Sequence, residues 1–165
     1  MSVIDKIIIV YTIGFFIHSV VFLLYQFEVV GIAERQMGCW IRFSNIVETV
    51  FLVLIHTFTP SRYGKWCIAA FYLLSILLLV LQLIFAEGGL GQKILDAIWI
   101  GFYVILFAYD ICGIGLAEMI SCLTELENFK LLNNFLKNTF VGDIVLGVLI
   151  PVLRAAIIQV MQREE

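Results

Sequence analysis

The stretch of sequence that decides the fold is Ile94 to Ala117, ILDAIWIGFYVILFAYDICGIGLA. It is almost entirely apolar, yet Asp96, Tyr103 and Asp110 recur in it at seven-residue spacing. Seven residues make nearly two helical turns, so these three polar side chains fall on one narrow face of a helix. Ionisable groups within an apolar segment are costly in lipid, and they turn toward a protein interior or a watery cavity. We therefore expect the other helices to pack around this face.

The composition of the whole chain is that of a membrane protein. Of its 165 residues, 62% are hydrophobic and only 14% are charged, whereas soluble domains carry about 25% charged residues. We expect an all-α integral membrane protein with a single membrane domain over residues 1–165 and the lipid bilayer as its surroundings. The ten Lys and Arg residues are scattered and the net charge is -3, so we expect no nucleic-acid partner.

Four apolar runs are long enough, or nearly so, to cross the bilayer as a helical bundle, at about residues 7–27, 43–59, 66–86 and 94–117. The connection over residues 28–42 is expected to lie outside the spans.

A fifth run, 140–161, is also long enough to span, but it contains Asp143, Pro151 and Arg154. It is either a fifth transmembrane helix or an amphipathic helix at the interface. Asp143 and Arg154 would be about 16 Å apart along one helix, too far to pair with each other. We therefore expect each of them to need a partner from elsewhere, on another protein or among lipid headgroups.

Charge bias between the loops favours four spans. With four spans, one side of the membrane holds seven basic residues and the other holds three: Lys6, Arg62, Lys65, Lys130, Lys137, Arg154 and Arg163 against Arg35, Arg42 and Lys93. The positive-inside rule then places the N-terminus on the cytoplasmic or matrix-like side. Five spans would nearly remove this bias.

The other three helices also carry polar stripes, which together define a candidate site. Tyr11, His18 and Tyr25 recur at seven-residue spacing, and so do Ser75 and Gln82. The intramembrane stripe residues that we single out are Asp96, Tyr103, Asp110, Glu48, His56, Asn45, His18 and Gln82. Such groups either pair with one another to hold the bundle together or form a proton or cation path at successive depths.

Cofactor chemistry has weaker support. His18 and His56 could ligate a haem between helices, but by residue count their depths differ by about 6 Å. No metal-ligand spacing is present. We expect no metal, no cofactor and no catalytic residue.

One short stretch resembles a known family. Glu34 and Arg35, followed by Arg42, Asn45 and Glu48-Thr49 entering a helix, look like the second-helix motif of the membrane-associated glutathione and eicosanoid metabolism family. The resemblance implies a trimeric four-helix fold with Arg42, Asn45 and Glu48 at glutathione-binding positions. It covers fewer than twenty residues, and the arginine-rich third helix of that family has no counterpart in 66–86.

The chain has no phosphate-binding loop, nucleophile elbow or metal motif, so an enzyme is not favoured. We expect a non-catalytic accessory or structural subunit of a larger membrane complex or homo-oligomer. The alternative is a proton or cation channel or transporter that uses the intramembrane carboxylates and histidines. A haem-binding or glutathione-dependent membrane enzyme ranks below both.

Overall fold

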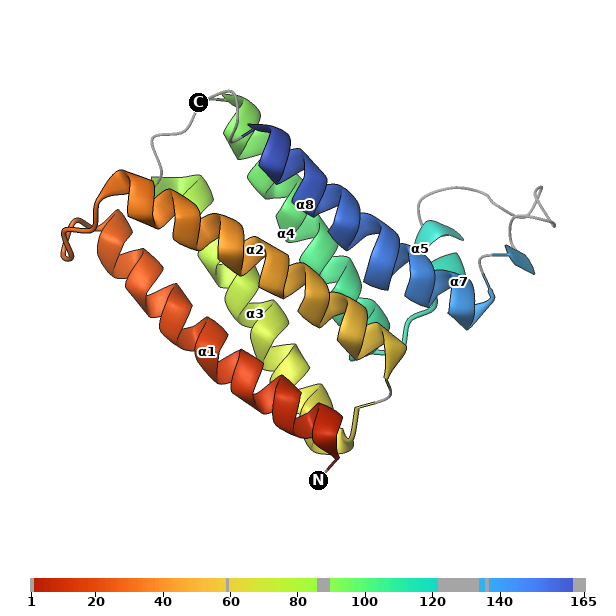
Figure 1. Ribbon diagram of the computed structural model, residues 1–165. Coiled ribbons are helices and arrows are strands. Elements are labelled where there is room, and N and C mark those ends of the chain that lie inside the picture. The colour runs from red at the N-terminus through yellow and green to blue at the C-terminus, as the bar shows by residue number, and fades with distance from the viewer. Residues whose placement is uncertain (1, 59, 86–89, 122–133, 136, 162–165) are drawn as a thin grey trace. The chain divides into compact units, whose positions relative to one another are not determined.

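A computed structural model describes residues 2–58, 60–85, 90–121, 134–135 and 137–161 (Figure 1). These residues form helices and connections, without a strand among them. The elements are α1 (Val3–Gln26), α2 (Glu34–Thr57), α3 (Arg62–Phe85), α4 (Leu90–Asp110), α5 (Leu116–Ser121), α7 (Thr139–Ile144), the π-helix η2 (Val145–Leu149) and α8 (Ile150–Met161).

The elements gather into two compact units. Unit 1 comprises Met1–Gly31 and Pro60–Gly113, and unit 2 comprises Ile32–Thr59 and Ile114–Glu165. Unit 1 therefore contains α1, α3 and α4, and unit 2 contains α2, α5, α7, η2 and α8. The single membrane domain expected over residues 1–165 stays a prediction.

Four stretches of helix are long and apolar enough to cross a membrane, by length and composition: Val3–Gln26, Arg35–Thr57, Arg62–Phe85 and Phe140–Ile157. This set fits a multi-pass membrane protein, but it differs from the four expected spans. It includes the C-terminal helix, whose role the sequence left open. It does not include α4, which carries Lys93, Asp96 and Asp110 within 21 residues.

Two expected helix boundaries are wrong. The connection predicted through Arg42 is helical from Glu34 onward, because Glu, Arg, Gln and Met favour a helix without forming an apolar run. The helix predicted over 94–117 ends at Asp110, and Gly113 follows in the left-handed region with φ 71°. Two expected span ends, Thr59 and Ala86, lie outside the described residues.

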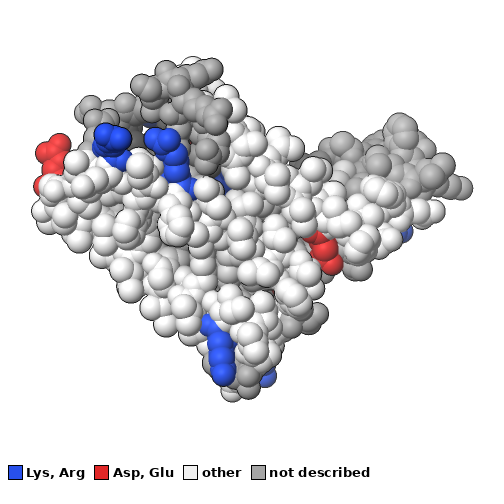
Figure 2. Space-filling model, in the orientation of Figure 1, with Lys and Arg blue, Asp and Glu red and all other residues white. Residues whose placement is uncertain are grey.

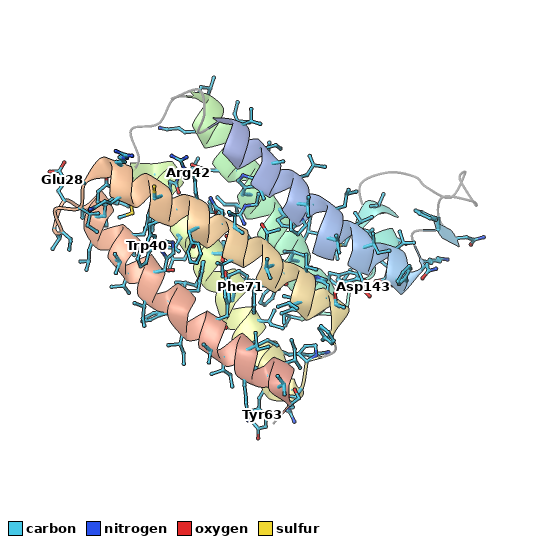
Figure 3. The ribbon with its side chains drawn as sticks, in the orientation of Figure 1. Glu28, Trp40, Arg42, Tyr63, Phe71 and Asp143 are labelled. Carbon is cyan, nitrogen blue, oxygen red and sulfur yellow. The ribbon has the colours of Figure 1, made fainter. Side chains whose placement is uncertain are left out.

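Local hydrogen bonds set both ends of α1. At its start, the Ser2 hydroxyl accepts a hydrogen bond from the Asp5 backbone N–H, and the Asp5 carboxylate accepts one from the Ser2 backbone N–H. This reciprocal capping box satisfies two otherwise unpaired donors. At its end, Glu28 takes a left-handed conformation, φ 56°, beyond the last turn (Figure 3).

In unit 1, α3 packs against both α1 and α4. The first turns of α1 and α3 lie together, because Asp5 Oδ1 also accepts a hydrogen bond from the Ser61 backbone N–H at 3.0 Å. A Cβ on Gly64 would lie 2.8 Å from the same oxygen, so only glycine permits this approach. α1 and α3 are therefore parallel, and α4 runs antiparallel to α3 (Figure 1).

In unit 2, α2 packs against α7, η2 and α8. Glu48 of α2 meets Arg154 of α8, whereas His56, two turns later in α2, meets Gly147 of η2. The partner's residue number falls as the number in α2 rises, so the C-terminal helix runs antiparallel to α2 (Figure 1).

Polar backbone and side-chain groups in these helices are largely satisfied locally. Hydroxyls bond to the carbonyl four residues earlier in Thr12, Ser19, Thr49, Thr57 and Ser75. The face drawn in Figure 2 has few charged side chains among its described residues. Both features suit a lipid environment, where no water is at hand to satisfy polar groups.

Candidate functional site

The polar stripe of α4 lies against α3 within unit 1. Tyr103 is completely buried and Asp96 is nearly so. The hydroxyl of Tyr72, on α3, donates a hydrogen bond to Asp110 Oδ2 at the C-terminal end of α4. Seven-residue spacing thus turns all three stripe positions of α4 away from the exposed side of the helix.

An aromatic cluster surrounds this stripe and centres on Phe71 of α3. The Phe71 ring lies 4.8 Å from Phe15, 5.6 Å from Tyr11, 5.5 Å from Tyr72 and 6.1 Å from Tyr103, between ring centroids. The pairs with Phe15, Tyr11 and Tyr103 have edge-to-face geometry, which aromatic rings prefer, and the pair with Tyr72 is tilted. The cluster joins all three helices of unit 1 through one side chain.

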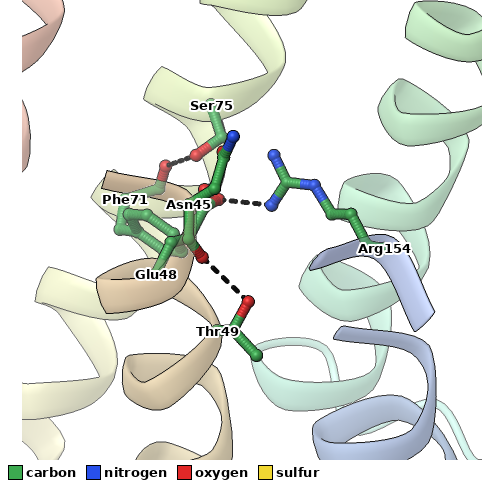
Figure 4. A network of polar contacts seen from close by, with 6 residues as sticks. All are labelled: Asn45, Glu48, Thr49, Phe71, Ser75 and Arg154. Carbon is green, nitrogen blue, oxygen red and sulfur yellow. Dashed lines mark hydrogen bonds and ion pairs between the residues drawn. The ribbon is translucent and has the colours of Figure 1, made fainter. Parts of the chain in front are cut away.

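Sequence reasoning missed Tyr72, although a signal for it was present. Tyr72 precedes Ser75 by three residues and Gln82 by ten, so it lies on the same face of α3 as the two expected stripe residues. Ser75 is buried and bonds to the Phe71 carbonyl (Figure 4). Gln82 is half-buried near the end of α3.

His18 occupies an aromatic environment on α1. Its ring centroid lies 6.2 Å from that of Phe15 and 6.4 Å from that of Phe22, and its side chain is half-buried. His56, the other proposed haem ligand, belongs to unit 2. The haem hypothesis stays a prediction. Within the described ranges, no three His, Cys, Asp or Glu side chains are grouped to hold a metal ion.

The polar residues of α2 centre on an ion pair in unit 2. Arg154 Nη1 lies 2.8 Å from Glu48 Oε1, and the two side chains are 10% and 5% exposed (Figure 4). Asn45 is half-buried one turn before Glu48, and its carbonyl accepts a hydrogen bond from the Thr49 hydroxyl at 2.8 Å. The ion pair therefore joins α2 to α8 in a largely apolar environment.

The expectation that Arg154 needs a partner on another protein or a headgroup is wrong. Its partner is Glu48 of the same chain. The signal was available in the sequence. Two opposite charges in separate apolar runs have the lowest free-energy cost of burial when they form an ion pair with each other. Pairing also engages the Glu48 carboxylate that the family resemblance would assign to glutathione. Asp143 is half-buried on α7.

His56 marks a second close contact between the helices of unit 2. Its Nδ1 lies 2.7 Å from the Leu52 carbonyl oxygen, one turn back in α2. Gly147 of the π-helix packs directly on the same side chain, and a Cβ at Gly147 would overlap the Cβ and Cγ of His56. The sequence showed His56 as a stripe residue but gave no sign of Gly147 as its neighbour.

Comparison with known proteins adds no relative, because no family model, curated protein or solved structure matches the chain.

Proposed function

We propose that the chain is a non-catalytic, multi-pass membrane subunit whose intramembrane polar groups hold its own helices together. The observation that carries this proposal is the Glu48–Arg154 ion pair, because it pairs a buried carboxylate of α2 with a buried guanidinium of α8. The Tyr72–Asp110 hydrogen bond does the same between α3 and α4. Groups engaged in this way stabilise a bundle and need no substrate to explain them.

The outward faces of the helices support a role in assembly. Large apolar side chains are exposed on every long helix, for example Phe16 at 57%, Phe43 at 70%, Trp66 at 67% and Leu153 at 52%. Lipid covers such surfaces in a membrane, and so do the helices of other subunits. Helices with such apolar outer faces fit an accessory or structural role.

We also infer five membrane crossings rather than four, from helix direction. If α1 crosses from side A to side B, α2 returns to A and α3 crosses to B again, parallel to α1. The C-terminal helix is antiparallel to α2, so it too must cross from A to B. The chain must therefore return to A between α3 and α7, and α4 is the helix that can do so. Its 21 residues measure about 31 Å, enough for one crossing.

Five crossings change the expected sidedness. Side A then carries Lys6, Arg62, Lys65, Lys130 and Lys137, and side B carries Arg35, Arg42, Lys93 and Arg163, with Arg154 inside the membrane. Five basic residues against four give no orienting bias. The cytoplasmic position proposed for the N-terminus depended on four spans and loses that support.

Single-cysteine labelling in sealed vesicles tests the number of crossings. Native cysteines are replaced by serine, and cysteine is placed at exposed Val30, Lys137 or Val160. Five crossings predict that Val30 and Val160 react on one side and Lys137 on the other. Labelling of Val160 on the side of Lys137 supports four spans with an interfacial C-terminal helix. If position 137 is labelled on the same side as position 30, α4 does not cross the membrane.

Purification under mild conditions tests the subunit proposal. The tagged chain is extracted from its native membrane in a non-ionic detergent, and the mass of the purified particle is measured. A stoichiometric complex or a homo-oligomer is expected. A stable monomer after extraction and after chemical crosslinking in the membrane would contradict the proposal.

A second candidate function is a proton or cation path along α4. The observation in its favour is the line of Asp96, Tyr103 and Asp110 on one face of α4, where Asp96 and Tyr103 are buried and Asp110 is half-buried and bonded to Tyr72 of α3. A reconstituted flux assay would then show conduction that Asp110→Asn abolishes. Glu28→Gln is the matched control, because Glu28 is an exposed carboxylate outside any helix. Absence of flux in the unaltered protein rejects the path.

A further inference from the structure

The first turns of α2 carry two arginines on one face of the helix. Arg35 and Arg42 are seven residues apart, which is nearly two turns, and both side chains are exposed. Met37 and Glu48 are buried on the opposite face, where Glu48 meets α8. The two arginines therefore project from the outer side of this part of α2.

The Arg42 side chain extends back toward the start of α2 (Figure 3). A Cβ built on Gly38, one turn before Arg42, would lie 4.0 Å from Arg42 Nη2. Gly38 has no side chain of its own, so the helix surface between Arg35 and Arg42 is open. Long basic side chains near the end of a transmembrane helix reach in this way from the apolar layer to the headgroups.

Apolar side chains continue the same face of α2 toward the middle of the helix. Ile46 and Val50 follow Arg42 by four and eight residues, and both are exposed. Trp40 and Phe43 are exposed beside the arginines, and tryptophan is typical of the level where the membrane meets water. The outer side of α2 thus presents two cations first and apolar surface after them, which is the order of headgroup and acyl chain in a phospholipid.

We propose that Arg35 and Arg42 bind the phosphate headgroup of an anionic phospholipid whose acyl chain lies along Ile46 and Val50. The proposal rests on the membrane location in the proposed function and adds a ligand to it. Guanidinium groups donate paired hydrogen bonds to phosphate oxygens, and basic residues at the membrane surface attract anionic lipids. A zwitterionic lipid carries its own cation beside the phosphate, so it gains less from the two arginines.

Position 46 is well placed to report on the bound lipid. Eight residues separate Ile46 from Gly38, the level that the Arg42 guanidinium reaches, and this is about 12 Å along the helix axis. The headgroup layer is about 5–7 Å thick on each side of the hydrocarbon, so position 46 lies beside the acyl chains. Bromine atoms on the chain of a neighbouring lipid quench the fluorescence of a tryptophan placed there.

Single-tryptophan variants in bilayers of defined composition measure the lipid preference locally. Ile46→Trp is made in a background in which the native tryptophans are replaced by phenylalanine, and Phe16→Trp, at an exposed position of α1, is the matched control. Each protein is reconstituted in mixtures of phosphatidylglycerol and phosphatidylcholine, with bromine on the chains of one lipid or the other. The two quenching curves give the ratio of the binding constants of the two lipids at that position.

Ile46→Trp should report a preference for phosphatidylglycerol of about fivefold for each arginine that contacts the headgroup. Phe16→Trp should report a ratio near one. Arg35→Gln combined with Arg42→Gln should abolish the preference at position 46. Arg62→Gln combined with Lys65→Gln removes the same charge from exposed positions at the start of α3 and should leave the preference unchanged.

Four results overturn the lipid site. A ratio near one for Ile46→Trp shows that this face does not select the headgroup. An equal loss of preference in the Arg62 and Lys65 double variant assigns the attraction to net charge. Quenching of Phe16→Trp by both lipids and of Ile46→Trp by neither shows that a protein surface covers this face. If neither variant is quenched by either lipid, the chain is not in the bilayer, and the proposed function fails as well.

Native mass spectrometry keeps the test independent of the tryptophan replacements. The unaltered chain, extracted in detergent and supplied with equal amounts of the two lipids, should retain phosphatidylglycerol at collision energies that remove phosphatidylcholine. Arg35→Gln combined with Arg42→Gln should lose this difference. Equal retention of phosphatidylglycerol by the unaltered chain and this double variant overturns the site.

Discussion

Glu48 on α2 and Arg154 on α8 lie far apart in the sequence, yet their side chains meet at 2.8 Å and both are buried. Each is the kind of residue that an apolar helix tolerates poorly when alone. Their contact explains how both helices can carry an ionisable group and still be apolar enough to cross a membrane. The same contact fixes the relative direction of the two helices.

The first prediction concerns the cost of breaking this pair. Arg154→Leu or Glu48→Leu alone removes one member of a buried ion pair and should lower the free energy of unfolding by about 3–5 kcal/mol. The double variant removes both charges and should be close to the unaltered protein, because paired burial brings little net gain. Helix content followed during denaturant titration in mixed micelles measures both. A double variant whose loss of stability equals the sum of the two single losses would show that the residues act independently.

The second prediction concerns the contact of Gly147 with His56. Gly147→Ala places a methyl group where the His56 side chain lies and should cost about 1–3 kcal/mol of stability through overpacking. Gly14→Ala is the matched control, since Gly14 lies in α1 with no neighbouring atom within 4 Å of the added Cβ. It should be neutral or stabilise by up to about 1 kcal/mol.

Rescue makes the Gly147 prediction more specific. His56→Gly removes the Cβ, Cγ and Cδ2 atoms that an added Cβ would meet, so Gly147→Ala should cost less in that background. An equal cost with and without the His56 ring would locate the effect of Gly147 in its backbone instead.

The third prediction concerns the hydrogen bond between α3 and α4. Tyr72→Phe removes the donor to Asp110 and should cost about 0.6–1.7 kcal/mol, the range found for such bonds within membranes. A double-mutant cycle with Asp110→Ala measures the coupling of the two side chains directly. Tyr63→Phe is the control, because Tyr63 is 76% exposed at the start of α3 (Figure 3). A coupling energy near zero would mean that the bond does not stabilise unit 1.

The fourth prediction concerns the end of α1. Glu28 adopts φ 56°, a conformation that costs a residue with a Cβ about 1 kcal/mol or more. Glycine has no such cost, so Glu28→Gly should raise the stability of the protein by about 1 kcal/mol. Glu28→Ala keeps the Cβ and should bring no gain. Thermal unfolding of the three proteins side by side in one detergent distinguishes conformation from charge.

Helix ends were predicted less well than helix interiors. Apolar runs located most of α1 and α3, because hydropathy is a property of each residue along the run. The start of α2 at Glu34 lies in a polar stretch without a side-chain cap, and the end of α4 at Asp110 is followed by one left-handed glycine, Gly113. Each of these features involves only a few residues, and hydropathy averaged over a long window does not detect it.

The sequence predicted which helix faces carry the polar residues of the candidate site, but it did not predict which residues contact them. Period-seven spacing singled out Asp96, Tyr103 and Asp110 on one side of their helix. Tyr103 and Asp110 contact α3, and Asp96 is buried. Tyr72 and Arg154, which complete the contacts, were respectively overlooked and assigned elsewhere. Which stripe meets which depends on helix order and direction, and spacing within one helix contains no information on either.

The sequence by itself determined that the protein is helical, that its long helices are apolar enough for a membrane, and which faces of them are polar. These properties follow from residue chemistry and from the helical repeat, which act locally. Only the tertiary structure decided that α1 and α3 run parallel through Asp5 and Ser61, and that Glu48 pairs with Arg154. It also placed Gly147 on His56. Such pairings join residues far apart in the chain, and they are selected by the packing of whole helices.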